Sequence, residues 1–436
     1  MSGLLAGAAC ASIAPRPEDL AEGIYLGGFG SYRQRRATGI HDEPQCRAVA
    51  IGDGSTAFVL AVLDLVGAAG PLLAAIRAAA TRLTRLPPER IIIACTHSHA
   101  SPDMQGLWGG TGAAYQKHVA QRSAEAIAQA HQAITPVEAR VATTALSGVV
   151  RNRRGWPDTD ETLTTLRLVT AQGAPVATIV NYACHPTASG PANTDVSRDW
   201  CGFAADAIER ELGGVAVYVN GAVGDANPAA DGSFDAARSL GEAVARAAVA
   251  SLADADAVQG SVRARTESLE LPLAFERLSQ RVQDAVGRAA PALSVLGKAG
   301  AMRAASRSLH AAGRADLAQI VAALAGMSER RLVVRDGRTY LPTHCGYVSV
   351  GDALEAFAAP GEVLTRLALP LRASLGARHR MFFGLAHDTL GYFLPEDEWM
   401  TGRNNNYEES VSTGRRSGAL LAEALLAMAP HAGEVA

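Results

Sequence analysis

The sequence lacks the features that would assign it at once to several classes of protein. Its formal net charge is only −3 and it contains no run of Lys or Arg, so nothing in it matches the charge of a nucleic-acid backbone. The longest apolar stretch, residues 57–76, is broken by Asp64 and by Gly70 and Pro71, a pattern that favours a strand, a turn and a helix over a membrane span. We therefore expect no nucleic-acid partner and no insertion into a membrane.

The cysteines and the N-terminus lack the marks of a secreted protein. None of the six cysteines belongs to a C-x-x-C pair. Cys95 and Cys184 lie within apolar, strand-like runs, so we expect buried thiols and not disulfides, as is usual in a reducing compartment. No basic residue precedes Arg16, unlike the charged start of a secretory signal. Together these features predict a soluble, cytoplasmic protein.

Length and composition predict an α/β protein with an insertion. A chain of 436 residues can form one large α/β domain or two domains. Residues 1–255 alternate between strand-like and helix-like segments, which predicts a mixed-sheet, multi-layer catalytic core. Residues 256–340 are rich in Ala, Arg and Leu and poor in strand formers, so we expect a mostly helical insertion or lid. Residues 341–436 return to a mixed pattern and are expected to complete the core.

Hydrophobic periodicity and turn signals locate the main elements. We expect strands at 55–65, 90–95, 215–220, 347–350 and 381–385, a hairpin within 136–183 that turns at Gln172 and Gly173, and helices at 71–86, 113–134, 200–212, 234–252, from Pro360 and from about Gly414.

Two histidine motifs follow apolar, strand-like runs. The string THSH at residues 96–99 contains His97 and His99, and NYACHPT at residues 181–187 contains His185. Strand ends are where an α/β sheet presents ligands, and in an extended segment the side chains of His97 and His99 would point to the same side. Either motif alone is also compatible with hydrogen-bonded structural histidines. Together they indicate a metal site, because zinc sites are usually assembled from separate strand ends and loops.

Three further segments carry polar residues whose chemical signal is weak in isolation. The loop GAVGDANP at residues 221–228 contains Asn227 and has glycines suited to a tight turn, but it lacks the Gly-Lys-Ser/Thr ending of a phosphate loop. Glu362 follows a Pro-Gly pair at an expected helix start, where a carboxylate often serves only the helix dipole. Tyr407 follows three asparagines, a pattern typical of a loop.

Taken in order along the chain, these segments resemble the neutral ceramidase family. THSH and NYACHPT are the specific matches, and Asn152-Arg153, GAVGDANP and the APGE string that ends at Glu362 stand in the family's order. The resemblance spans nearly the whole chain and is weakest over residues 256–340. In that family two histidines, a glutamate and a C-terminal tyrosine bind one zinc ion. The matching positions here are His97, His185, Glu362 and Tyr407.

The resemblance implies a zinc-dependent hydrolase in which metal-activated water attacks an amide carbonyl, or that of an ester or lactone. Bound zinc can lower the pKa of water to about 7 and polarise the carbonyl. It also implies that His99 assists proton transfer or holds the substrate, and that Arg153 stabilises the developing oxyanion.

Three departures from the family pattern bear on the substrate. Asn227 stands where the family has a catalytic serine, and an amide side chain cannot act as that nucleophile or proton relay. Arg154 and Trp156 replace the family's Ser-Pro-x-x-Tyr pattern, and the sequence has no room for the family's C-terminal immunoglobulin-like domain. Because Arg favours bidentate contacts with anions, we expect a small, polar, anionic amide or ester in preference to ceramide, with Arg153 and Arg154 contacting it.

Two other functions remain compatible with these residues. The same zinc and oxyanion groups would serve an amide-forming or cyclising biosynthetic enzyme, and Asn227 would suit a metal-binding homologue without catalysis. The sequence predicts a small-molecule substrate and leaves the oligomeric state open.

Overall fold

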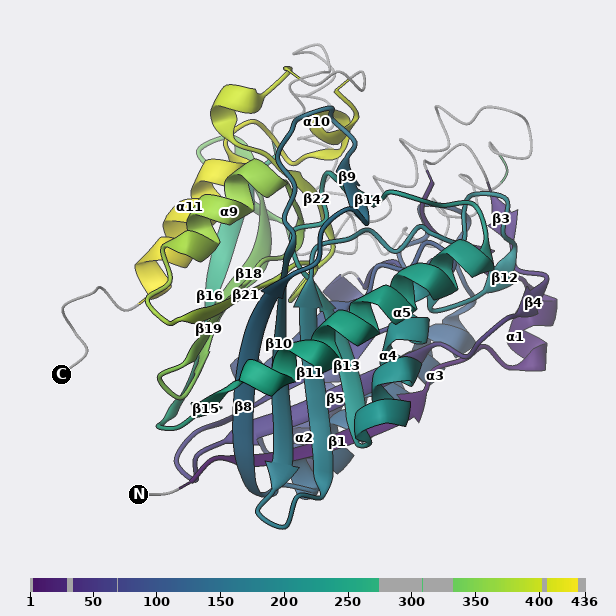
Figure 1. Ribbon diagram of the computed structural model, residues 1–436. Helices are drawn as coiled ribbons and strands as arrows, with labels where there is room; N and C mark the ends of the chain where they lie inside the picture. Colours follow the sequence, from purple (N-terminus) through teal and green to yellow (C-terminus); the bar gives the residue numbers. More distant parts are fainter. Residues whose placement is uncertain are drawn as a thin grey trace.

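The computed structural model describes residues 3–29, 34–68, 70–273, 332–401 and 406–429, together with Ser308. Two β-sheets lie face to face in this part of the chain, and helices cover the outer face of each, which gives four layers (Figure 1). The expected mixed-sheet, multi-layer α/β architecture is therefore confirmed.

The larger sheet has nine strands in the order β13-β11-β10-β8-β1-β5-β6-β7, with β15 beside β8. The β6–β7 and β11–β13 pairs are parallel. Both faces of β6 and β7 are covered, which explains their almost continuous apolar sequences. The strands are β1 (Leu5–Ser12), β5 (Gln45–Gly52), β6 (Ala57–Leu63), β7 (Ile91–Cys95), β8 (Thr135–Ala145), β10 (Thr162–Thr170), β11 (Pro175–Tyr182), β13 (Val215–Asn220) and β15 (Asp256–Val258).

The second sheet has five strands in the order β16-β18-β19-β21, with β17 beside β18. Here β19 and β21 run parallel, while β16 pairs with β18 in antiparallel register over its whole length. The strands are β16 (Val262–Pro272), β17 (Val333–Arg335), β18 (Arg338–Val350), β19 (Leu354–Ala358) and β21 (His379–Phe383).

The prediction of a mostly helical segment over 256–340 is wrong at both ends. Residues 256–258 and 262–272 form β15 and β16, and strands also lie at 333–335 and from 338. The Arg, Glu and Leu residues of β16 favour helices in isolation, but pairing with β18 and burial of Val262 overrode that preference. The middle of the segment lies outside the described residues.

Apolar side chains fill the spaces between the layers. Leu60 of β6 and Val348 of β18 belong to the core between the two sheets. On the outer face of the larger sheet, Ile93 packs in the core beneath α2 and α3, and Tyr218 packs beneath α4 and α5, while α9 and α11 cover the second sheet. These helices are α2 (Gly70–Thr84), α3 (Ala113–Gln132), α4 (Asp199–Leu212), α5 (Phe234–Ser251), α9 (Thr365–Ala373) and α11 (Ser417–Met428).

Shorter helices and strands lie at the ends of the two sheets. They are α1 (Pro17–Glu22), β2 (Tyr25–Leu26), β3 (Arg35–Arg36), β4 (Gly39–Ile40), η1 (Pro88–Arg90), β9 (Val150–Asn152), β12 (Asp195–Val196), β14 (Ala226–Pro228), η2 (Leu252–Asp254), β20 (Gly361–Val363), β22 (Leu390–Phe393), η3 (Glu396–Glu398) and α10 (Tyr407–Val411). The helix expected from Pro360 begins instead at Thr365, because residues 361–363 pair with β22. Glu362 therefore lies on a strand and not in the first turn of a helix.

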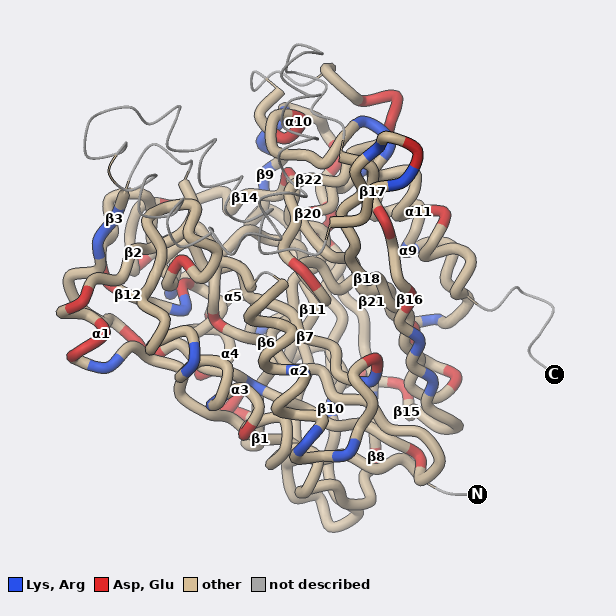
Figure 2. The backbone as a smooth tube through the Cα atoms, turned by 180° about the vertical axis from the view of Figure 1, so that it is seen from behind, with Lys and Arg blue, Asp and Glu red and all other residues tan. Residues whose placement is uncertain are grey.

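Three further observations bear on the sequence expectations. All six cysteines are described and free, and every one except Cys10 is buried, which confirms buried thiols without disulfides. None of the helices in the described ranges is long and apolar enough to cross a membrane. Basic and acidic residues are interspersed along the chain in the view of Figure 2.

Candidate metal centre

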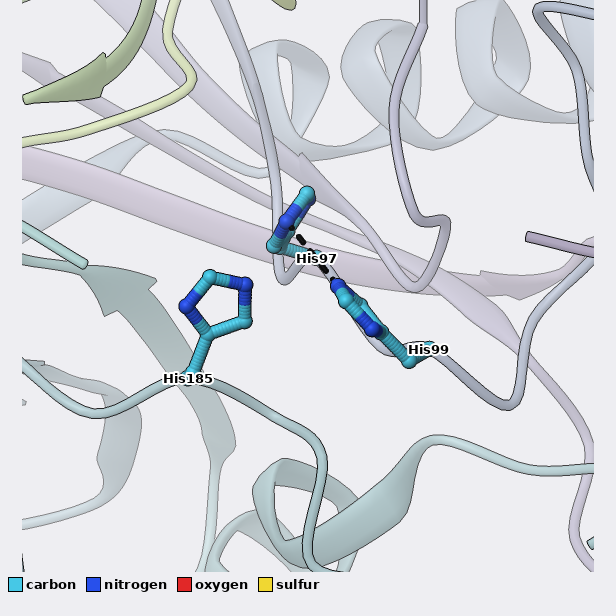
Figure 3. A group of neighbouring side chains, drawn as sticks. All are labelled: His97, His99 and His185. Carbon is cyan, nitrogen blue, oxygen red and sulfur yellow. Dashed lines mark hydrogen bonds between the residues drawn. The ribbon is translucent and has the colours of Figure 1, made fainter. Parts of the chain in front are cut away.

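The predicted histidines meet beyond the carboxyl ends of β7 and β11. His97 and His99 follow β7, and His185 follows β11 (Figure 3). The ring centroids lie 4.8 Å apart for His97–His99 and His97–His185, and 4.9 Å apart for His99–His185. His97 has φ of 67°, so the THSH string turns sharply at this residue and is not extended as expected. The two imidazoles are brought together by that turn.

Glu362 of β20 faces two of these rings. Its Oε1 lies 3.6 Å from Nε2 of His97, and its Oε2 lies 3.6 Å from Nε2 of His185. These separations are beyond hydrogen-bonding range. The carboxylate therefore spans the pair without being hydrogen-bonded to either ring.

Backbone carbonyls determine the tautomers of His97 and His185. Nδ1 of His97 contacts the carbonyl oxygen of Val66, and Nδ1 of His185 lies 2.8 Å from that of Val223. A carbonyl oxygen only accepts hydrogen bonds, so each Nδ1 carries the proton and each Nε2 presents a lone pair to Glu362. Metal-binding histidines are usually oriented by the same kind of contact.

His99 has the opposite tautomer. Its Nδ1 accepts a hydrogen bond from the backbone N–H of Phe29 at 3.2 Å, so the proton is on Nε2 and points to Nε2 of His97, also at 3.2 Å (Figure 3). Gly28 makes this approach possible, because a Cβ at that position would lie 2.2 Å from the His99 ring. His99 therefore offers a proton where the other two histidines offer lone pairs.

Burial disfavours the charged forms of both the imidazoles and the carboxyl group. It lowers the pKa of His97 to about 4 and that of His185 well below its usual value, although Val223 opposes the shift at His185. Burial also raises the pKa of Glu362 to about 7, against the opposing effects of Arg153 and Tyr392. Within the described residues, neither Nε2 of His185 nor Oε2 of Glu362 has a hydrogen-bond partner. Two buried imidazole nitrogens with free lone pairs beside a buried carboxyl group fit a divalent metal ion such as zinc, whose charge would replace the proton that burial favours on Glu362.

The three histidines also form a group by themselves. Their nearest ring nitrogens all lie within 4.8 Å of one another, so a three-histidine site is geometrically conceivable. The hydrogen bond from Phe29 argues against it, because His99 would have to lose that bond or its Nε2 proton to become a ligand. The tautomers favour His97, His185 and Glu362 over the histidine triplet.

Tyr392, which the sequence analysis missed, lies beside Glu362. It is the Cα partner of Glu362 in the β20–β22 pairing and is only 6% exposed. Its hydroxyl interacts with the Glu362 carboxylate and with Arg153. Tyr407, the expected ligand, is 40% exposed, and its ring centroid lies 5.8 Å from that of Tyr392. The local sequence does not distinguish a metal-binding tyrosine from a core tyrosine in an apolar strand, so Tyr392 was not predicted.

Arg153 and Arg154 have different surroundings. The Nε of Arg153 donates to Glu408 at 2.9 Å, its guanidinium lies 5.0 Å from the Tyr392 ring centroid, and its Nη2 is buried without a hydrogen bond among the described residues. The fully buried Arg154 donates to Glu408 at 2.7 Å and to Glu409 at 2.9 Å. Arg154 is therefore neutralised inside the protein and is not available to an anionic substrate, contrary to expectation.

Asn227 lies in β14, which pairs with the strand that leads into Arg153. The backbone N–H of His185 donates to the carbonyl oxygen of Ala226 at 2.8 Å, so this loop adjoins the histidine site. Oδ1 of Asn227 is buried without a partner in the described ranges. Asp225 anchors the loop by accepting from Asn152 at 2.7 Å.

Comparison with solved structures identifies the class of fold. The crystal structure of a neutral ceramidase from Pseudomonas aeruginosa superposes with a TM-score of 0.73 at 18% identity, over 98% of this chain and 74% of that one. A ceramidase complexed with C2 gives a TM-score of 0.70 at 17% identity, with the same coverage. The fold is thus that of the neutral ceramidases.

The sequence also matches a family model. The model described as neutral/alkaline non-lysosomal ceramidase, N-terminal, covers residues 19–255. The chain belongs to this family, which confirms the resemblance, and its membership supports a hydrolase that acts on amide bonds. A comparison with curated proteins finds no match.

Proposed function

We propose that this protein is a zinc-dependent amidohydrolase whose metal is held by His97, His185, Glu362 and Tyr392. One observation carries the proposal: two buried imidazoles place unprotonated Nε2 atoms 3.6 Å from the two oxygens of one carboxylate. Membership of the ceramidase family supports amide hydrolysis as the reaction.

Tyr392 replaces Tyr407 in this ligand set. Tyr392 is buried beside Glu362 on the neighbouring strand, whereas Tyr407 is 40% exposed on α10 and contacts the ring of Tyr392. Burial raises the pKa of both phenols, so either would need a cation to ionise at neutral pH. The position of Tyr407 favours a role at the entrance to the site.

Each of the other residues has a role that follows from its hydrogen bonds. A bound zinc ion would supply Lewis acidity, which activates water at neutral pH and polarises the carbonyl of the substrate. His99 holds a proton on Nε2, and loses its present acceptor when the lone pair of His97 is used as a ligand. That proton is then available to the leaving nitrogen of an amide, the task of a general acid.

Arg153 and Asn227 contribute polar groups to the site, but neither side chain is a nucleophile. Nη2 of Arg153 is buried and unpartnered, and so can stabilise negative charge on the carbonyl oxygen as the amide is attacked. The Asn227 amide is not nucleophilic, which favours direct attack by water over an acyl-enzyme.

The substrate we propose is a lipid-like N-acyl amide. The expectation of a small, polar, anionic molecule depended partly on Arg154, whose charge is taken up by Glu408 and Glu409. Exposed apolar side chains instead lie on α10 or before it, namely Met400, Tyr407 and Val411, and the ring of Tyr407 lies 5.8 Å from the Arg153 guanidinium. These would suit an acyl chain better than a charged group.

The test combines metal analysis with a substrate panel. The panel holds a short-chain ceramide analogue, N-acyl amino acids, and an ester and a lactone of matched chain length. We expect about one zinc per chain and zinc-dependent hydrolysis, with the highest kcat/KM for an uncharged N-acyl amide. Full activity after complete metal removal would refute the proposal. Metal binding without hydrolysis would favour the non-catalytic homologue, and amide formation from acid and amine would favour the biosynthetic alternative.

A further inference from the structure

A cavity with polar lining residues lies apart from the histidine site, beside β7 at the end of the larger sheet. It has a volume of about 300 Å³, and its lining includes Arg77 of α2, His387, His344 and the hydroxyl-bearing Thr266 and Ser268 of β16. Figure 2 shows α2 and β16 on the face opposite to that of Figure 1, and η1 contacts both. None of these residues belongs to the proposed metal centre.

His387 is held at this cavity in an unusual way. Its φ of 71° is in the left-handed region, and its backbone N–H donates to the carbonyl oxygen of Ile93 at 2.7 Å. The side chain is only 3% exposed, and its Nε2 has no hydrogen-bond partner among the described residues. A buried polar atom without a partner is costly, and a non-glycine residue with positive φ often marks a functional position.

Arg77 determines the tautomer of His387. Its Nη2 lies 3.2 Å from Nδ1 of His387, and a guanidinium can only donate, so Nδ1 is the acceptor and Nε2 carries the proton. The unpartnered group is therefore an N–H donor. A donor cannot bind a metal cation, and so the cavity is suited to an anion.

The direction of this N–H follows from the register of the second sheet. Nε2 of His387 lies 2.8 Å from where a Cβ of Gly346 would be, so the ring sits over Gly346. Gly346 pairs with Thr266 and His344 pairs with Ser268, and opposite residues in an antiparallel pair face the same side of the sheet. The donor of His387 and the hydroxyls that line the cavity therefore share one face.

Charge and hydrogen bonding at the cavity favour an oxyanion. Burial lowers the pKa of Arg77, against the opposing effect of Asp388, and its Nε and Nη2 are engaged by Ile91 and His387. Nη1 makes no hydrogen bond to the described residues. Asp388 offsets part of the positive charge while accepting from Thr343 and Thr389. The exposed Glu89 and His344 lie at the rim.

We propose that this cavity binds a compact oxyanion, such as a phosphate group, between the Arg77 guanidinium, the Nε2–H of His387 and the hydroxyl of Ser268. Arg is well suited to such a group because its donors match the geometry of phosphate and carboxylate. The cavity has room for roughly ten waters at about 30 Å³ each, so the phosphate can be free or the end of a larger molecule.

Isothermal titration calorimetry on the full, metal-loaded protein tests the proposal with inorganic phosphate and with glycerol phosphate. We expect saturable binding of at least one of the two, and the tighter ligand identifies the source of the group. Ser268→Asp places a negative charge in the cavity and should weaken binding at least tenfold, whereas Ser268→Asn, similar in size and uncharged, should weaken it far less. Because Ser268 is exposed, both variants should fold.

Arg77→Gln should also weaken binding, and Arg82→Gln serves as its control, because Arg82 is exposed on the same helix. Phosphate that bound at the metal centre would be insensitive to Ser268→Asp. Equal affinities of Ser268→Asp and Ser268→Asn, or the absence of saturable binding of either ligand to the unaltered protein, would overturn the proposal.

Discussion

Nε2 of His185 lies 3.6 Å from Oε2 of Glu362, and neither atom has a hydrogen-bond partner in the described part of the chain. Because the Nδ1 proton of His185 is directed to Val223, the two facing atoms are both electron-pair donors. Two such donors repel each other in a buried site unless a cation or a proton lies between them. Burial disfavours protonation of the imidazole, and a proton on the carboxyl would bring the two atoms within hydrogen-bonding distance. The separation of 3.6 Å therefore points to a metal ion.

Glu362→Gln should therefore reduce zinc content. The amide keeps the size of the side chain but removes the negative charge and one anionic ligand atom, so affinity should fall at least 10–100-fold, the range typical even of outer-shell changes. Zinc per chain is measured by mass spectrometry after dialysis against a weak chelator. Glu18→Gln, at an exposed position, is the matched control. Unchanged zinc in Glu362→Gln would exclude this carboxylate as a ligand.

His97→Ala and His99→Ala should separate metal binding from turnover. His97 presents a lone pair, so its removal should release zinc, whereas His99 presents a proton, so its removal should leave zinc in place. Loss of a general acid should lower kcat by about 10²–10⁴-fold. Zinc content and kcat are measured on the same preparations. Equal zinc loss in both variants would favour the three-histidine site.

Tyr392→Phe and Tyr407→Phe should identify the phenolate ligand. Tyr392→Phe removes the hydroxyl beside Glu362 and Arg153, and should weaken zinc binding and activity together. Tyr407→Phe should leave zinc content unchanged and act mainly on KM, since its ring is 40% exposed and we place it where the substrate enters. A zinc titration with a competing chromophoric chelator distinguishes the two. Zinc loss confined to Tyr407→Phe would show instead that Tyr407 is the ligand, as expected from the sequence.

The sequence was sufficient for the histidines and for part of the larger sheet, but not for β1, β5 and β15 or for the surroundings of the site. His97, His99 and His185 follow continuous apolar strands. This pattern involves only residues adjacent in the sequence, so it can be recognised without the fold. The position of Tyr392 at the site and the burial of Arg154 depend on contacts between segments hundreds of residues apart, such as that of Arg154 with Glu408. The strand β16 was missed for a related reason, since only pairing with β18 makes its composition compatible with a sheet.

The free energy of unfolding of the metal-free protein should depend on pH because of the raised pKa of Glu362. Its pKa is about 7 in the folded state against 4.5 ordinarily, so between these pH values the folded state retains a proton that the unfolded state has released. The free energy of unfolding should then fall by about 3 kcal/mol as the pH rises through this window. His97, whose pKa falls to about 4, contributes in the opposite direction between pH 4 and 6.5.

Comparison with Glu362→Gln isolates this contribution, because the amide does not titrate. Urea unfolding of both proteins in the presence of a chelator, at pH 5 and at pH 8, should show the variant gaining stability relative to the unaltered protein as the pH rises. A difference between the two proteins that is independent of pH would mean that Glu362 titrates normally.

Arg154 should matter for stability and not for substrate charge. It is fully buried and donates to Glu408 and Glu409, so Arg154→Met would remove the guanidinium from Glu409 and leave Glu408 with Arg153 alone. Breaking such a cluster typically costs about 3–5 kcal/mol, whereas replacing all partners together is often nearly neutral. Urea unfolding should therefore show a large loss for Arg154→Met and partial recovery when Glu408→Gln and Glu409→Gln are added.

The kinetic consequence separates the structural role of Arg154 from a substrate-binding one. Below the unfolding range, Arg154→Met should change kcat/KM for charged and uncharged N-acyl amides by the same factor, because the guanidinium does not reach the substrate. Arg153→Met should lower kcat/KM for both more strongly, since its unpartnered Nη2 is the group available to the carbonyl oxygen. A selective loss of activity toward anionic substrates in Arg154→Met would show instead that Arg154 contacts the substrate.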